Sequence, residues 1–213
     1  MTDAGWVRFD GLIAGAAFAS GDQLVVGCWP VSPFGPFVDA MWARPDGSRV
    51  LVIDDGPQEA FVRSHYRFDE VITSEVGARV SSDGVVFVGG PVCLQIELAG
   101  PTILSAALGL RPRFVRERDW WGRLEDALFR PALAPVIGRG VRARGVTTAG
   151  TRERYVARDV RWATGVSASL DGRDLGPTAP PRGPAGFGFS EFLARPGAVR
   201  VTSLFEPRAL VSR

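Results

Sequence analysis

The stretch FVDAMWARPDGSRVLVID, residues 37–54, decides the fold class. Two mostly apolar runs, FVDAMWA (37–43) and SRVLVID (48–54), flank the segment RPDGS (44–48). Proline, aspartate and glycine form tight turns because proline presets its backbone angle, glycine adopts positive φ and aspartate bonds to nearby backbone. Two short apolar runs joined by such a turn predict a β-hairpin.

Similar apolar runs on either side of this hairpin predict further strands. QLVVGCW (23–29) precedes the hairpin and is rich in β-branched residues. FDEVITSEV (68–76) and VSSDGVVFVGGPVCLQIELAG (80–100) follow it, with turns at SSDG and GG. These runs predict a β meander up to about residue 100.

The second half of the chain continues the same pattern. GVRARGVTT (140–148) and TRERYVARDVRWATGVSASL (151–170) predict two strands joined by a turn at TAGT. Segment 171–189 is rich in Pro and Gly and predicts an ordered loop. AVRVTSLF (198–205) predicts a final strand.

Segment 54–67, DDGPQEAFVRSHYR, has a helical rather than a strand pattern. Pro57 is suited to the first turn of a helix, and Asp55 or Gly56 lies where the N-cap is expected. A short helix is therefore predicted here.

A second helix is predicted over residues 116–130, within RERDWWGRLEDALFRPALAPVIG (116–138). Its apolar residues recur at helical spacing until Pro131, which is expected to end the helix. The pair Trp120 and Trp121, flanked by arginines, is also compatible with a membrane interface, but packing on a sheet explains it equally well and is favoured. The residues at helical spacing are Trp121, Leu124 and Leu128.

The fold class predicted from these elements is mainly β: an antiparallel curved sheet, a lipocalin-like barrel or a two-lobed sandwich, with one or two covering helices. A single β-rich domain over residues 1–213 fits this length. The alternative is two β subdomains, about 1–110 and 139–213, joined by the helix at 116–130. The 26 Gly and 16 Pro are interpreted as turn residues, because apolar runs lie between them.

Composition excludes several kinds of chemistry. All 25 basic residues are arginine, so no lysine can form a Schiff base, link pyridoxal phosphate or complete a phosphate-binding loop. There is no asparagine and hence no N-glycosylation acceptor. The search for dinucleotide-binding, serine-hydrolase, zinc and calcium motifs is negative, and neither a cofactor nor a metal is expected.

Location and partners are constrained only weakly. A net charge of +2 without an arginine block does not favour nucleic acid. The first 22 residues lack a basic region before their apolar stretch, and no apolar run approaches the length of a membrane span, so a cytoplasmic protein is expected. Cys28 and Cys93 both lie in apolar runs and are interpreted as two buried thiols rather than a disulfide.

An aromatic, proline-rich loop, WPVSPFGPF (29–37), suggests a ligand pocket. Three prolines stiffen it, and large aromatic side chains of this kind line the mouths of apolar pockets. The alternative is a loop that covers the open end of a sheet. The predicted ligand-binding residues here are Trp29, Phe34, Phe37, Met41 and Trp42.

Three residues are candidates for catalysis. Asp39 interrupts an apolar strand and by alternation shares a face with Phe37 and Met41, where its carboxylate needs a partner or acquires a perturbed pKa. His65 is the one imidazole of the chain, and a packing histidine is the more economical interpretation. Tyr66 is a candidate for stabilising charge.

Four arginines suggest a site for an anionic group. If the TAGT turn pairs residue 144 with residue 154, then Arg142, Arg144, Arg152 and Arg154 share one face of the hairpin. Four like charges on one face require acidic neighbours or an anionic ligand. A solvated face with Glu153 and Asp159 at its edge is the simpler alternative.

The sequence therefore leaves three functions open. The leading one is binding of a small hydrophobic or amphipathic molecule, with an arginine on its anionic end. The second is a cofactor-free isomerase, cyclase or hydrolase that uses Asp39 or His65 as acid and base. The third is an interaction module whose aromatic loop docks a protein partner or a second copy of the chain.

Overall fold

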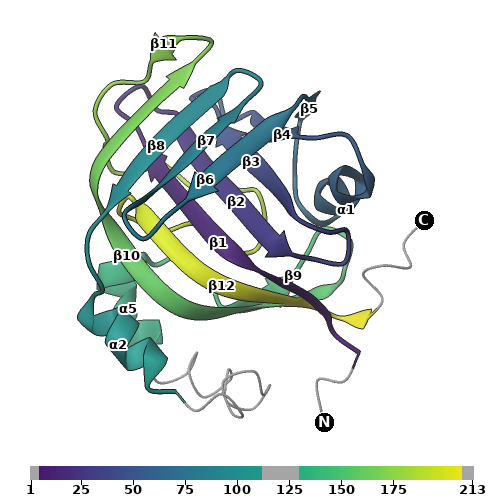
Figure 1. Ribbon diagram of the computed structural model, residues 1–213, viewed down its shortest axis with the longest axis vertical. Coiled ribbons are helices and arrows are strands. Elements are labelled where there is room, and N and C mark those ends of the chain that lie inside the picture. Colours follow the sequence, from purple (N-terminus) through teal and green to yellow (C-terminus); the bar gives the residue numbers. More distant parts are fainter. Residues whose placement is uncertain (1–4, 112–129, 208–213) are drawn as a thin grey trace.

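The computed structural model describes residues 5–111 and 130–207, and the chain there forms one strongly curled sheet with short helices (Figure 1). This architecture confirms the predicted mainly β class with a curved, largely antiparallel sheet and covering helices. In chain order the elements are β1 (Val7–Ala17), β2 (Gln23–Val31), β3 (Phe37–Ala43), β4 (Arg49–Ile53), α1 (Pro57–His65), β5 (Glu70–Thr73), β6 (Val76–Val80), β7 (Gly84–Gly89), β8 (Val92–Leu98), α2 (Ile103–Gly109), α5 (Arg130–Ile137), β9 (Arg144–Val146), β10 (Arg152–Leu170), β11 (Arg173–Asp174) and β12 (Gly197–Phe205).

The strand order is β5-β4-β3-β2-β1-β12-β10-β8-β7-β6, with β9 and β11 paired to β10. β12 lies between β1 and β10, in the middle of the sheet (Figure 1). β10 joins the two halves, because its first part pairs with β12 and its last part with β8. The curl lets β7 and β8 pack over β1, β2 and β4 around a core that includes Leu24, Val26, Val52, Phe87 and Leu94.

Several predicted elements are confirmed. β3 and β4 form the hairpin around the RPDGS turn, with Ala43 opposite Arg49. β6, β7 and β8 form an antiparallel meander, and β9 pairs with β10 in the predicted register, Arg144 opposite Arg154. Helix α1 begins after Gly56, whose φ is 150°. Glycine adopts this positive φ readily, whereas a residue with a side chain would be strained there.

Other expectations were wrong or incomplete. β5 is not part of the meander, because it pairs in parallel with β4 after the α1 crossover. β1 and α2 were not predicted. The helix predicted over 116–130 lies almost wholly outside the described residues, so its expected end at Pro131 stays a prediction; the described helix α5 runs from Arg130 to Ile137.

The two cysteines are free and do not pair. Cys28 is buried, as predicted, and burial raises the pKa of its thiol to about 12. Cys93 is exposed, which corrects the prediction, because alternation along β8 buries Val92 and Leu94 and turns Cys93 outward. None of the helices in the described ranges has the length and apolarity that a bilayer span requires.

Candidate functional site: a cavity with two buried carboxyls

A cavity of about 580 Å³ lies on the face of β1–β3 turned away from the β7–β8 core, hereafter the cavity face. Helices α1, α2 and α5 and the loop 187–193 cover it. The wall formed by the sheet includes Phe9, Ile13, Val25, Gly27, Trp29, Phe37, Asp39, Met41, Tyr155, Ala157, Val199, Val201, Ser203 and Phe205. The cover includes Phe61, Tyr66, Leu104, Leu108, Arg111, Ile137, Arg142, Phe187, Glu191, Phe192 and Leu193.

Glycines in β1 and β2 leave space on the cavity face, because they carry no side chain there. Gly11, Gly15 and Gly27 have the same parity as the lining residues of β1 and β2. A Cβ on Gly15 would lie 3.2 Å from the ring of Phe192, and a Cβ on Gly27 would lie 2.5 Å from both Asp39 Oδ1 and Trp29 Nε1. The glycine at position 27 therefore leaves room for the contact between Trp29 and Asp39.

Asp39 is a buried acid in an apolar wall. Its side chain is 1% exposed, and Oδ1 accepts a hydrogen bond of 3.0 Å from Trp29 Nε1. Burial raises the pKa of Asp39 to about 7, and the Trp29 hydrogen bond only partly opposes this. A carboxyl that titrates near neutrality in an apolar cavity can accept or donate a proton there.

A second buried carboxyl, Glu153, lies behind two tyrosines at the cavity wall. Glu153 is 0% exposed, and its Oε1 accepts hydrogen bonds of 2.7 Å from Tyr66 Oη and 2.7 Å from Ser203 Oγ. The Tyr66 hydroxyl lies 3.1 Å from the Tyr155 hydroxyl. Burial raises the pKa of Glu153 to about 7, whereas the surrounding hydroxyls lower it.

Sequence reasoning assigned Glu153 to a solvated arginine face and missed this site. The usable signal is parity: Glu153 and Tyr155 alternate with Arg152 and Arg154 on β10, so the acid and the tyrosine share the opposite face. Tyr66, which was a candidate, comes from the residue after α1 and could not be connected to Glu153 by any local pattern.

His65 is a packing histidine that does not line the cavity. Its ring stacks on Phe61 with 4.1 Å between centroids, and Nδ1 lies 2.8 Å from the Phe61 carbonyl oxygen, to which it donates. Burial lowers the pKa of His65, which favours the neutral ring. This environment gives no access for a substrate.

The aromatic candidates divide between the two faces of the sheet. Trp29, Phe37 and Met41 line the cavity together with Asp39. Phe34 packs on Phe61 at 5.4 Å, outside the lining. Trp42, which was expected at the pocket, does not line the cavity. Alternation along β3 turns it to the opposite face, where its Nε1 donates a 2.8 Å hydrogen bond to Asp22.

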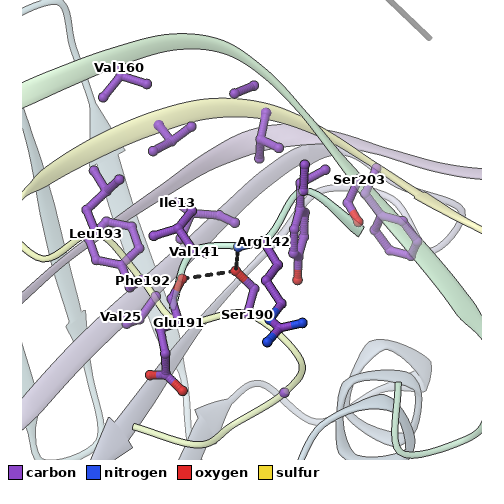
Figure 2. Close-up of a pocket in the computed structure, with 18 of the residues that line it drawn as sticks. Ile13, Val25, Val141, Arg142, Val160, Ser190, Glu191, Phe192, Leu193 and Ser203 are labelled. Carbon is purple, nitrogen blue, oxygen red and sulfur yellow. Dashed lines mark hydrogen bonds between the residues drawn. The ribbon is translucent and has the colours of Figure 1, made fainter. Parts of the chain in front are cut away.

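The four arginines do not form one site. Arg142 lines the mouth of the cavity and is exposed, and its backbone N–H donates to Ser190 Oγ at 2.9 Å (Figure 2). Arg144, Arg152 and Arg154 lie outside the lining, and Arg154 stacks on Trp6 at 4.4 Å. The predicted shared face therefore excludes Arg142, which precedes β9.

The cover of the cavity is fixed by the loop that carries Ser190 and Glu191. The carboxylate of Glu191 accepts backbone hydrogen bonds from Ala185 at 2.8 Å and Gly186 at 3.2 Å. Arg111, which sequence reasoning also missed, follows α2 and donates to the carbonyls of Leu108 and Ala157. The Glu191 bonds hold the loop together, and the bond from Arg111 to Ala157 connects the end of α2 to β10.

Within the described ranges, no three His, Cys, Asp or Glu side chains are placed to hold a metal ion together. No protein-family model matches this chain, and no curated protein matches it. Among solved structures, an acetoacetate decarboxylase from Legionella pneumophila is 11% identical with a TM-score of 0.44, covering 96% of this chain and 86% of that chain. A further acetoacetate decarboxylase structure is 9% identical with a TM-score of 0.47, covering 95% and 85%. Similarity at this level identifies no family and transfers no functional residue to this chain.

Proposed function

We propose that this protein binds a small hydrophobic or amphipathic molecule in the cavity. The observation that carries the proposal is the cavity itself, whose volume of about 580 Å³ falls within the roughly 300–1,000 Å³ typical of small-molecule pockets. Its lining is aliphatic and aromatic, with few polar groups. Sites of this kind take most of their affinity from buried apolar surface and their orientation from those polar groups.

Arg142 gives such a ligand an orientation. Its guanidinium lies at the mouth, and no ion pair joins it to the residues that the structure describes. An anionic end of the ligand would pair with Arg142 while the apolar part enters between Ile13 and Leu193 (Figure 2).

Filling the cavity tests this proposal. Ile13 points into the cavity (Figure 2), so Ile13→Trp is expected to weaken binding of anilinonaphthalene sulfonate, an apolar dye with one anionic group, at least tenfold. Fluorescence titration measures the affinity. The matched control is Val88→Trp, which adds the same side chain at an exposed position on β7 and should leave the affinity unchanged. Equal affinities for the wild type and both variants would mean that the dye binds elsewhere.

Native mass spectrometry of the purified protein addresses the natural ligand. A discrete mass above that of the denatured chain would reveal a molecule retained through purification. Loss of that extra mass in Ile13→Trp, but not in Val88→Trp, would locate it in the cavity.

A second candidate function is cofactor-free acid–base catalysis, of the kind carried out by isomerases, cyclases and some hydrolases. The specific observation that favours it is the buried carboxyl of Asp39, whose pKa is raised to about 7 at the cavity wall. A carboxylate freed of water is a stronger base than one in solution, and a positioned base typically accelerates proton transfer by about 10²–10⁴.

Base strength can be measured without knowing the substrate. Nitrobenzisoxazole is a neutral bicyclic probe whose ring opens when one carbon-bound proton is removed, and the wild type is expected to accelerate this opening with a rate that rises through about pH 7. Asp39→Asn should lower the rate about a hundredfold. The matched control is Asp22→Asn, because Asp22 also accepts a tryptophan indole hydrogen bond but lies off the cavity. A rate unaffected by Asp39→Asn would remove Asp39 as the base.

A further inference from the structure

We infer that the cavity binds its ligand through a neutral carbonyl oxygen, which accepts a hydrogen bond from the Tyr155 hydroxyl at the end of a Glu153–Tyr66–Tyr155 chain. The inference rests on the proposed binding function and names the chemical class of its ligand. Three features support it: the number of hydroxyl protons in this hydrogen-bond chain, the position of the two tyrosines on the cavity wall and the burial of Glu153 behind them.

When Glu153 is ionised, all the hydrogen bonds of the cluster point toward its carboxylate. Tyr66 and Ser203 both donate to Oε1, and Tyr155 donates to the Tyr66 oxygen 3.1 Å away. Every hydroxyl proton is then used inside the cluster. A ligand would meet only an oxygen lone pair of Tyr155, which can accept but not donate.

Protonation of Glu153 reverses the direction of the hydrogen bonds between Glu153, Tyr66 and Tyr155. Oε2 is buried and has no hydrogen-bond partner among the described residues, so a proton on that oxygen would donate to nothing. A proton on Oε1 donates instead to Tyr66, Tyr66 donates to Tyr155, and Ser203 can still donate to the second lone pair of Oε1. The Tyr66 oxygen then no longer takes the Tyr155 proton, which becomes available to the ligand.

The surroundings favour this protonated state. The titratable groups that face Glu153 are Tyr66 and Tyr155, with Asp39 beyond Tyr155, and none of them is a cation. Arg152 and Arg154 are neighbours on β10 but point to its other face. On the side of α1, burial lowers the pKa of His65 and so disfavours its cationic form.

The tyrosines are held in place before any ligand arrives. Tyr155 stacks on Phe189 with 5.3 Å between centroids and 22° between ring planes. A side chain on Gly145 would collide with Phe189, so the glycine admits that ring. A Cβ on Gly188 would lie 3.0 Å from the Tyr66 ring, which places the same loop against the second tyrosine. A fixed donor of this kind binds an acceptor oxygen without first reorganising.

These features select the ligand chemistry. A carboxylate at the Tyr155 hydroxyl would lie beside the buried carboxyls of Glu153 and Asp39, whereas a ketone, aldehyde or ester oxygen supplies a neutral acceptor for one donor. The ligand we infer is therefore an apolar carbonyl compound, with its oxygen at Tyr155.

The test compares two fluorescent probes that differ by one oxygen: prodan, a naphthalene carrying a ketone, and its analogue in which the carbonyl is replaced by methylene. The wild type should bind prodan about threefold to tenfold more tightly than the methylene analogue near pH 6, the value of one neutral hydrogen bond. Emission of bound prodan should be red-shifted by the hydrogen bond. Tyr155→Phe retains the ring that stacks on Phe189 and should abolish both the preference and the shift.

Proton dependence provides a second measurement. The preference for prodan should decline as the pH rises through about 7, because ionised Glu153 takes back the proton. Comparing the two probes cancels the effect of Asp39, which titrates in the same range. Glu153→Gln keeps an N–H donor toward Tyr66 at every pH, so the preference should persist above pH 8.

The failures of the two proposals can be distinguished. Probes that bind equally well to the wild type and to Ile13→Trp would overturn binding in the cavity. Probes excluded by Ile13→Trp but bound with equal affinity, or a preference for prodan that survives Tyr155→Phe, would overturn the carbonyl inference alone.

Discussion

Raising the pH from about 5 to about 8 is expected to lower the free energy of unfolding of the wild-type protein by about 3 kcal/mol relative to that of Asp39→Asn. Asp39 has its pKa raised from 3.8 to about 7 in the folded state by burial. A group with a raised folded pKa holds its proton more tightly in the native state, so its stabilising contribution is present below the unfolded pKa. That contribution is lost as the pH rises toward and through about 7. Asparagine keeps an oxygen for Trp29 and does not ionise.

Urea unfolding at both pH values, followed by circular dichroism, measures this difference. Asp10→Asn is the control: burial alone would raise the pKa of Asp10, but hydrogen bonds from Arg8 and Thr202 and the charges of Arg8 and Arg158 lower it. Asp10 is therefore ionised in both states throughout this pH range, and the stability difference between its variant and the wild type should stay constant. A constant difference for Asp39→Asn as well would mean that water reaches and stabilises the Asp39 carboxylate.

Phe9→Ala is expected to lower the free energy of unfolding by about 3–5 kcal/mol. Phe9 is 2% exposed and joins elements that are far apart in the chain. Its ring contacts five other aromatic rings at centroid distances of 5.1 to 6.3 Å: Trp29, Phe34, Phe37, Phe61 and Phe205. Removing it leaves a void between β1, α1 and β12 that these rings cannot all close.

The matched comparison is Phe34→Ala, which removes the same atoms from the half-buried loop at the edge of this cluster. Its loss of stability, measured by urea unfolding, should be smaller, because neighbouring side chains and solvent can fill the space. Equal losses for the two variants would show that Phe9 is not the centre of the cluster.

β1 illustrates why part of the fold could not be predicted. The hairpin of β3 and β4 is recognisable from two apolar runs around a turn. In β1, by contrast, Gly11, Gly15 and several alanines interrupt the apolar residues, so the strand pattern is weak. Those glycines are needed for close approach: a Cβ on Gly15 would meet a carbonyl of β2 and the ring of Phe192. A strand selected for small residues has little β propensity of its own, and its conformation comes from tertiary pairing.

The site was predictable to the extent that it depends on alternation along one strand. Period two placed Asp39 with Phe37 and Met41, and the structure brings these side chains to one cavity wall. The same rule should have excluded Trp42. The cluster of Tyr66 and Glu153 brings together the residue after α1 and a residue of β10 through long-range packing, which a single sequence does not encode in any local pattern.

The central position of β12 has a consequence for how the protein is made. β1 pairs with β12, Val7 opposite Phe205, and β12 supplies the link between β1 and β10. A ribosome therefore releases every other described strand before β12, the strand that completes the sheet. Until β12 emerges, the apolar side chains and unpaired backbone of β1 stay exposed, so a nascent chain of this topology should depend on chaperones that shield strand edges.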